Sequence, residues 1–245
     1  MADNDKQIKE LFDTKVHLGH KKNRIHPKAK KYIYTMDNGV SIIDLTKTAE
    51  LLDKAEKYIT SLSKEEKKLL VVATKRIASS AIEKFCKENN ISYVTSKWPA
   101  GLLTNFETVR KNVKKMEDMK KAKEEKQWDK LVKHEQSALG KELIKLERFY
   151  GGLSDLKKMP DALFIVDIKK EKNALAEARN FNLSIIAIVD TNVDPSLVNF
   201  PIPGNDDSFS SVDCLFKKAM AGYITEKSKT PALPAGRQKP NEKSV

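Results

Sequence analysis

The sequence has few of the residues on which common catalytic and metal-binding motifs depend. It contains two cysteines, Cys86 and Cys214, which are far apart and fall in amphipathic helical patterns. We therefore expect buried, reduced thiols and neither a disulfide nor a metal pair. A glycine-rich phosphate loop, a Walker lysine and a serine elbow are all missing from the 245 residues. These absences argue against the usual nucleotide-dependent enzymes and hydrolases.

Long apolar runs are also missing from the sequence. No stretch approaches the roughly 18–20 apolar residues that span a bilayer. The first residues, Met1–Lys6, include acids where a signal or transit peptide would not have them. We expect a soluble, cytoplasmic protein with no membrane partner.

Basic side chains are in excess. Lys and Arg number 46 against 34 Asp and Glu, which gives a formal net charge of +12, and the hydrophobic fraction of 40% suffices for a packed core. An excess of positive charge favours a polyanionic partner such as nucleic acid, because neutralised phosphates release their counterions.

Short apolar runs alternate with amphipathic helical segments along much of the chain. Ala162–Val166 and Ser184–Val189 are continuous enough to be strands buried on both faces of a sheet, and Lys172–Phe181 between them has a helical pattern. Leu69–Ala73 and Ile91–Thr95 repeat the pattern earlier in the chain. The sequence therefore predicts an α/β fold with a doubly wound parallel sheet.

The strand–helix alternation is interrupted between residues 104 and 150. Apolar residues recur there at spacings of three and four in two stripes, and the second stripe begins at Val132. We expect an inserted antiparallel coiled-coil hairpin. The predicted division is residues 1–39 for an N-terminal helix and basic arm, 40–103 with 151–225 for the sheet domain, 104–150 for the hairpin, and 226–245 for a flexible tail.

A basic arm, Lys15–Lys31, contains no acid at all. Histidines and tyrosines that can stack on bases, such as His17, His20 and Tyr32, are interleaved with its cations. A solvated run of charge is the alternative, but uncompensated cations repel one another, and we favour phosphate binding. The cations are Lys15, Lys21, Lys22, Arg24, Lys28, Lys30 and Lys31.

Three of the four histidines, His17, His20 and His26, lie in this arm and raise the question of a zinc site. The usual ligand spacing is absent, since no helical i, i+4 pair exists and no cysteine or carboxylate is close in sequence. We expect no metal and no cofactor.

Two further groups of residues follow predicted strands. Lys75 and Arg76 open a helix, where cations are unfavourable unless an anion compensates them, so we favour phosphate contact there over exposure to water. Lys97 and Trp98 lie at the start of the predicted hairpin; Trp98 either packs into its base or contacts RNA. Further phosphate contacts are predicted for Thr104, Asn105 and Arg110.

Acidic residues also gather at predicted strand ends. Asp167, Asp190 and Asp206 could hold magnesium in a phosphotransferase. Asp and Asn beside Pro and Gly are also ordinary turn formers, and Asp206 or Asp207 before the last helix fits a helix cap. We favour the structural interpretation, but an enzyme using these acids remains the rival class. A free RNA-binding factor whose hairpin recruits proteins is a third alternative.

Several sequence blocks in this order resemble a known family. They are Val16–His17–Leu18–Gly19–His20, Thr74–Lys75–Arg76, Trp98 with Gly101–Asn105, Pro160–Phe164, Asp190–Asn192 and Pro203–Asp207. The chain resembles the universal small-subunit ribosomal protein family "S-two" in its bacterial form, over about Lys6–Ile224. It departs from that family at Lys97, where an arginine is usual; lysine keeps the charge but loses the bidentate fork.

The resemblance implies a non-catalytic protein with a flavodoxin-like sheet and a protruding coiled coil. It further implies binding to small-subunit rRNA, contact with neighbouring small-subunit ribosomal proteins, and help in docking the large mRNA-binding protein "S-one". No small-molecule substrate is expected. We therefore predict a structural constituent of the small ribosomal subunit that clamps phosphates with little readout of base identity.

Overall fold

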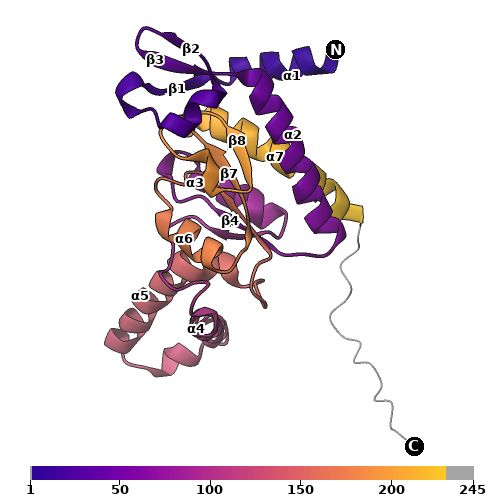
Figure 1. The fold of residues 1–245 in the computed structure, drawn as a ribbon. Helices are drawn as coiled ribbons and strands as arrows, with labels where there is room; N and C mark the ends of the chain where they lie inside the picture. Colours follow the sequence, from indigo (N-terminus) through magenta and orange to yellow (C-terminus); the bar gives the residue numbers. More distant parts are fainter. Residues whose placement is uncertain (1, 230–245) are drawn as a thin grey trace, which may run out of the picture.

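The computed structural model describes residues 2–229, and its centre is a five-stranded parallel sheet (Figure 1). In space the strands follow the order β5-β4-β6-β7-β8, which is 2-1-3-4-5 when the strands of this sheet are numbered along the chain. This is the order of flavodoxin-like doubly wound sheets. The predicted α/β class and parallel sheet are confirmed. The strands are β4 (Leu69–Val72), β5 (Ser92–Val94), β6 (Ala162–Ile165), β7 (Ser184–Val189) and β8 (Phe200–Pro203).

Strands β4 and β6, in the interior of the sheet, are buried along their full length because both of their faces are covered. Every residue of β4 and β6 is buried, as expected for continuous apolar runs in a parallel sheet. The sequence analysis missed β8, which carries Pro201 and Pro203. Proline is tolerated there because β8 is at the edge of the sheet and pairs only with β7.

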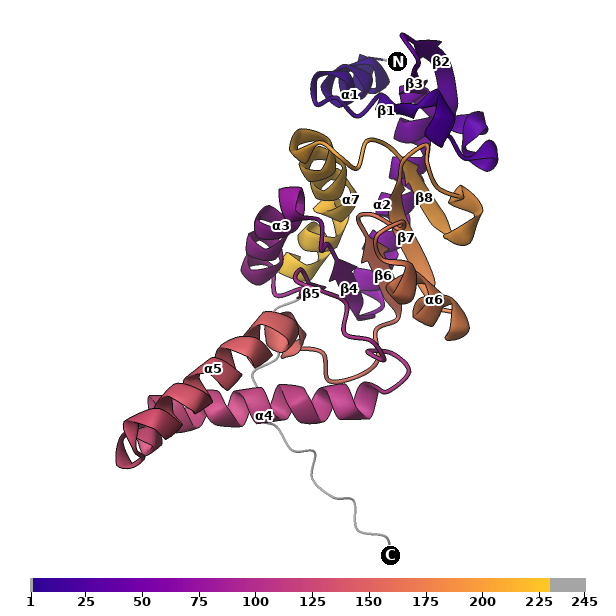
Figure 2. The same cartoon turned by 90° about the vertical axis from the view of Figure 1, so that its left-hand side faces the viewer.

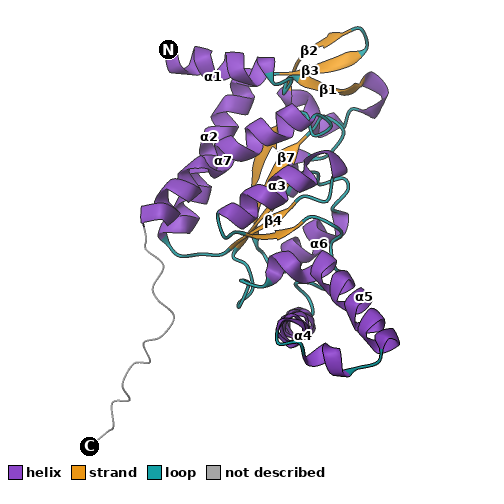
Figure 3. Cartoon of the chain, turned by 180° about the vertical axis from the view of Figure 1, so that it is seen from behind, coloured by secondary structure: helices purple, strands orange, loops and turns teal. Residues whose placement is uncertain are grey.

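Helices cover the two faces of the sheet unequally. Alternate strand residues such as Phe164 and Ile188 face one cluster with α2 (Leu45–Lys64), α3 (Arg76–Glu88) and α7 (Phe209–Lys229) (Figure 3). The opposite residues, such as Leu163 and Ile165, pack with α6 (Lys172–Asn180) and the base of α4 (Phe106–Glu124). Helix α2 begins after Asp44, which caps it: the Asp44 side chain accepts a hydrogen bond from the Thr46 amide.

The N-terminal segment forms a second, antiparallel sheet at the end of the molecule that carries α1 (Ala2–Asp13) (Figure 1). Asn38 and Gly39 both have positive φ and make the tight turn between β2 and β3. Part of the basic arm is ordered by pairing with β3. The elements are β1 (Leu18–Lys21), η1 (Lys22–Arg24), η2 (Pro27–Tyr32), β2 (Ile33–Asp37) and β3 (Val40–Ile43).

Two helices, α4 (Phe106–Glu124) and α5 (Lys133–Tyr150), interrupt the strand–helix alternation and project from the opposite end (Figure 2). They are joined through η3 (Gln127–Lys130) and contact each other. Val113, Met116 and Leu143 are buried. Val132 is 71% exposed, so its assignment to the second apolar stripe was wrong: it lies just before α5, where the helix has not yet begun.

Gly152, in η4 (Gly151–Leu153), lies directly on Tyr93 of β5. A Cβ at Gly152 would clash with the Tyr93 carbonyl oxygen. The absence of a side chain at this position therefore lets the chain leave α5 and return closely along the sheet.

The C-terminal prediction is corrected at one boundary. Helix α7 continues to Lys229, so residues 226–229 are helical and do not belong to the predicted tail; the rest of that tail lies outside the described residues.

Within residues 2–229, no helix is long and apolar enough to cross a membrane. Cys86 is buried and Cys214 half-buried, both as free thiols. The remaining element is η5 (Pro195–Leu197), between β7 and β8.

Candidate functional site

Acids and one lysine meet at the carboxyl edge of the parallel sheet. Asp167 follows β6, Asp206 follows β8 and Lys75 follows β4; because parallel strands end at the same edge, these distant residues converge. The Lys75 ammonium lies 2.8 Å from Asp206 Oδ1, 2.6 Å from Asp207 Oδ1 and 3.5 Å from Asp167 Oδ2. We call these four residues the Lys75 cluster.

The Lys75 cluster holds more negative than positive charge in a partly buried place. Burial lowers the pKa of Lys75, but its hydrogen bonds to Asp206 and Asp207 outweigh this effect and the net shift is upward. Burial, followed by the charges of Asp167 and Asp190, raises the pKa of Asp206 to about 7. The Lys75 ammonium is thus held in the charged form by carboxylates of its own chain.

The structure therefore corrects the prediction that Lys75 contacts phosphate. Its side chain is only 17% exposed and its charge is already compensated. The proposed cap role for Asp206 and Asp207 is replaced as well, because the side-chain contacts of Asp206 and Asp207 given by the structure are with Lys75 and His20. Arg76 next to Lys75 is exposed and has no ion pair within the described chain.

His20 joins the N-terminal segment to the same edge. Its Nδ1 lies 3.0 Å from Asp190 Oδ2 and its Nε2 lies 3.6 Å from Asp207 Oδ2. The hydrogen bond to Asp190 raises the pKa of His20, burial opposes that shift, and the charges of Asp190, Asp207 and Asp206 add to it. His20 is therefore occupied by these acids and is not free to stack on a base.

Ligand atoms from His20, Asp190 and Asp207 all lie within 4.8 Å of one another, so these three residues have the composition and spacing to hold a divalent cation. They line a hollow of about 480 Å³ together with Arg24 and Asn205. The histidine grouping considered from the sequence is not the one that the fold assembles. His17 is stacked on Phe12, with ring centroids 4.3 Å apart, and His26 binds the Lys28 amide through Nδ1.

The basic arm is fixed to the sheet by backbone contacts with the loop after β7. The His26 amide donates to the Thr191 carbonyl at 2.8 Å, and the His20 amide donates to Thr191 Oγ1 at 2.9 Å. Lys28 is exposed, but its ammonium lies 2.7 Å from Asp194 Oδ2 and binds Ser196 Oγ, so its charge already has a partner within the chain, and its phosphate contact stays a prediction. That same ammonium lowers the pKa of Asp194.

The other cations of the arm are exposed to solvent. Within residues 2–229 none of them takes part in an ion pair with a carboxylate. They are Lys15, Lys21, Lys22, Arg24, Lys30 and Lys31. The structure thus sets apart a group of uncompensated cations from two lysines, Lys28 and Lys75, that the sequence grouped with them.

The base of the α4–α5 pair is built around Glu177 of α6. One carboxylate oxygen accepts from Trp98 Nε1 at 3.0 Å and from the Gly101 amide at 2.9 Å, and the other accepts from the Leu103 amide at 2.9 Å. Trp98 is 4% exposed and so packs inside, which corrects its assignment to RNA. Lys97, Thr104, Asn105 and Arg110 remain exposed around this base.

Glu177 was missed by the sequence analysis. Its helix buries Ala174 and Ala178, which lie three residues before and one after it. The available signal was a carboxylate beside an apolar helix stripe. An acid that is partly buried in this way needs hydrogen-bond donors, so it indicates a structural contact.

The strand order defines a doubly wound α/β protein. At the carboxyl edge of its sheet the aspartates are paired with Lys75 and His20 of the same chain, and the basic arm is fixed beside them. Comparison with known proteins specifies the family. The family model described as ribosomal protein S2 matches residues 11–225. The chain belongs to the ribosomal protein S2 family, which confirms the resemblance drawn from the sequence blocks. The chain is also 43% identical to "Small ribosomal subunit protein uS2" of Cytophaga hutchinsonii over 209 residues, covering 85% of this chain and 82% of that protein.

Proposed function

We propose that this protein is a structural constituent of the small ribosomal subunit in the cytoplasm and binds small-subunit rRNA through exposed basic side chains. The observation that carries the proposal is the set of uncompensated cations on the arm, in a chain of the ribosomal protein S2 family. Lysines and arginines without carboxylate partners gain most from phosphates, because binding removes their mutual repulsion and releases counterions.

The proposed rRNA contacts are the exposed members of the predicted set that have no ion pair with a carboxylate among the described residues. Contacts of this kind position a protein on RNA without reading its bases. They are Lys15, Lys21, Lys22, Arg24, Lys30, Lys31, Arg76, Lys97, Thr104, Asn105 and Arg110.

A magnesium-dependent phosphotransferase is the competing function. Asp167 and Asp206 would be its metal ligands, but both lie against Lys75, which supplies their positive charge from within the chain. Asp190 binds the Thr191 hydroxyl and His20. Acids engaged in this way support the strand-end loops, so we assign them a structural role and propose that the protein is not an enzyme.

The α4–α5 pair and the division of the chain extend this proposal. We assign residues 104–150 to a coiled-coil insertion, supported by the burial of Val113, Met116 and Leu143 and by the Lys115–Glu142 and Lys120–Glu147 ion pairs between the helices. Residues 1–39 and the discontinuous 40–103 and 151–225 are the arm and the sheet domain. Neighbouring ribosomal proteins, including the mRNA-binding protein "S-one", are the proposed protein partners during assembly.

Incorporation into subunits tests the role of the arm. Replacing Lys21, Lys22 and Arg24 by alanine should reduce incorporation into small subunits, measured at a raised salt concentration where incorporation of the parent chain is no longer saturated. A matched control replaces three exposed lysines of α2, Lys54, Lys57 and Lys64, and loses the same charge. Equal incorporation of both variants and the parent chain at raised salt would refute the role of the arm.

Sedimentation of a cell extract separates the classes of function. A structural constituent travels with the small subunit in stoichiometric amount, whereas an enzyme or a free RNA-binding factor stays mostly near the top of the gradient. Loss of an activity on Asp190→Asn, with nucleotide-dependent turnover by the parent chain, would instead establish the enzyme.

A further inference from the structure

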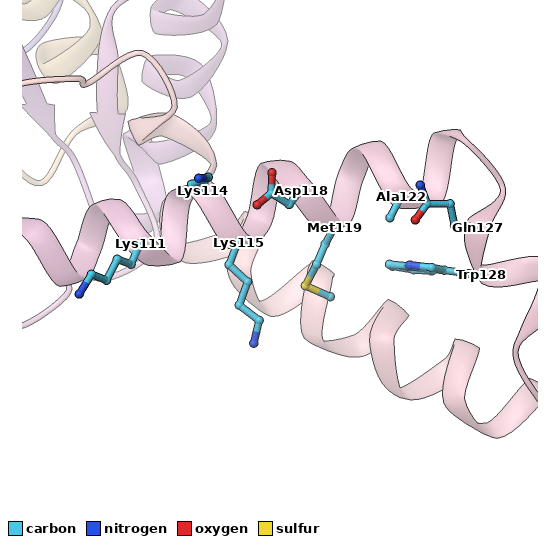
Figure 4. Close-up of a pocket in the computed structure, with 8 residues that line it drawn as sticks. All are labelled: Lys111, Lys114, Lys115, Asp118, Met119, Ala122, Gln127 and Trp128. Carbon is cyan, nitrogen blue, oxygen red and sulfur yellow. The ribbon is translucent and has the colours of Figure 1, made fainter.

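A groove runs along α4 away from the sheet domain and ends at a tryptophan. Figure 4 shows Lys111, Lys115 and Met119 leaving the same side of α4, with the Trp128 ring lying next to Ala122 near the far end. The hollow has a volume of about 620 Å³. Its lining residues are Lys111, Lys114, Lys115, Asp118, Met119, Ala122, Gln127 and Trp128. We call it the α4 groove.

The α4 groove combines positive charge with an aromatic ring. Lys115 is compensated by Glu142 at 2.5 Å, but neither Lys111 nor Lys114 has an ion pair in the part of the chain that the structure describes. Lysines three and four positions apart on one helix lie side by side. The groove therefore offers two uncompensated ammonium groups along its wall, against a single carboxylate, Asp118.

Trp128 supplies the aromatic ring on which a base could stack beside these lysines. It is half-buried and lies in η3, and its ring forms part of the groove surface. The other tryptophan, Trp98, is 4% exposed and bound to Glu177. An indole at the end of a lysine-lined groove is the combination with which proteins hold single-stranded nucleic acid: the ring stacks on a base while cations follow the backbone.

We propose that the α4 groove binds an unpaired stretch of RNA, with one base against Trp128 and phosphates of nucleotides further along the strand on Lys111 and Lys114. The inference rests on the proposed rRNA binding and adds a second contact to it. Arg110, already assigned to phosphate, lies on the same helix close to its base, so the proposed contacts at the base and in the groove are both carried by α4. An acidic protein segment would match the lysines but would gain less from the indole, which is why we argue for RNA.

Tryptophan fluorescence of the full chain reports on this groove, since only Trp128 can be reached by a ligand. A single-stranded oligoadenylate should quench the parent chain, while the Trp128→Phe variant, which retains the shielded Trp98, should show little change. Trp128→Ala should weaken binding of the oligonucleotide by about 5- to 150-fold, the range for losing one stacked base. Trp128→Phe should retain most of the affinity, because it keeps an aromatic ring.

Controls separate this inference from the proposed function. Phe181→Ala removes another exposed aromatic ring, at the end of α6, and should change nothing. Circular dichroism checks that each variant is folded. The arm variant Lys21→Ala, Lys22→Ala, Arg24→Ala should lose affinity for protein-free small-subunit rRNA but still show quenching by oligoadenylate.

Three outcomes would overturn the inference. If Trp128→Ala binds oligoadenylate as well as the parent chain, while the arm variant loses rRNA affinity, the groove is not an RNA site and the proposed function stands. If the parent chain itself does not bind rRNA, both fail together. If polyglutamate quenches Trp128 as strongly as oligoadenylate at the same ionic strength, the groove is a protein-docking site instead.

Discussion

The basic arm and the Lys75 cluster contain the same kind of side chain in opposite circumstances. Lys21 and Lys22 are exposed and have no carboxylate partner among residues 2–229, whereas Lys75 lies within 3.5 Å of three aspartates. Both were assigned to phosphate from the sequence. The difference teaches that a lysine is available to RNA only where the fold has not already surrounded it with acids.

The contrast separates two consequences of removing a charge. In the Lys75 cluster, the lost cation leaves partly buried carboxylates facing one another, so the cost falls on folding. In the arm, removing a cation relieves repulsion among its neighbours, so the cost falls on binding alone. The predictions below test whether the two regions behave so differently.

Lys75→Met should have the largest effect on stability. The substitution keeps most of the side-chain volume but leaves Asp167, Asp206 and Asp207 without their shared ammonium, and we expect a loss of about 3 kcal/mol. Urea denaturation measures it. Arg76→Met, one residue on and exposed, is the control and should change stability by less than about 0.5 kcal/mol. Equal losses in the two variants would contradict the special role of Lys75.

Glu177→Ala should come next. It removes the acceptor for the Trp98 indole and for the Gly101 and Leu103 amides, leaving donors unsatisfied at the base of α4. We expect a loss of roughly 2 kcal/mol. Hydrogen exchange of these amides provides the local measurement. Glu142→Ala, which breaks an exposed pair with Lys115, should leave their protection unchanged.

Asp206→Asn should change how stability depends on pH. The pKa of Asp206 is raised to about 7 from 3.8, so between these values the folded state holds a proton that the unfolded state releases. The free energy of unfolding of the parent chain therefore falls as the pH rises through this window. The asparagine variant lacks that contribution and should gain roughly 2.5 kcal/mol relative to the parent between pH 5 and pH 8, because about two pKa units of the shift fall in this window at about 1.36 kcal/mol each. His20 titrates in both proteins, so it cancels to first order in the difference.

The arm variant Lys21→Ala, Lys22→Ala, Arg24→Ala should change stability least, by less than about 0.5 kcal/mol. Its rRNA affinity should nevertheless depend less on salt: the slope of log K against log salt should fall by about two, since each lost phosphate contact removes roughly 0.7. Filter binding over a salt series gives this slope. An unchanged slope together with a large loss of stability would reverse the contrast between the two regions.

Much of the fold could be predicted because its signals are local. The strand Ser184–Val189 was predicted with the bounds that the structure has, since a continuous apolar run with clear ends determines it. Strand β1 was missed because Gly19 and Lys21 hide its pattern, and it gains its order from pairing with β3. β8 was missed because proline argues against a strand everywhere except at an edge, and edges are a property of the whole sheet.

The site was harder to predict because its contacts join distant parts of the chain. Lys75 and Asp206 are separated by 131 positions, and Trp98 and Glu177 by 79. Residue type alone indicates that Lys75 is a cation, but only the packing of the strand ends determines which anion it meets. The exposed lysines of the arm were easier, because a run without acids has no nearby partner to be paired with.

The central pairing of the sheet has a consequence for how the chain is made. β4 pairs with β6, joining Leu69 to Ala162, so the helical segment between them must be synthesised before the middle of the sheet can close. Until Ile165 has emerged, β5 is the single strand available to pair with Leu69–Val72, because the other partner of β4 is β6. Contacts so remote in sequence form slowly. During that interval the nascent polypeptide exposes the unpaired edge of β4 and its apolar side chains, which makes it prone to aggregation.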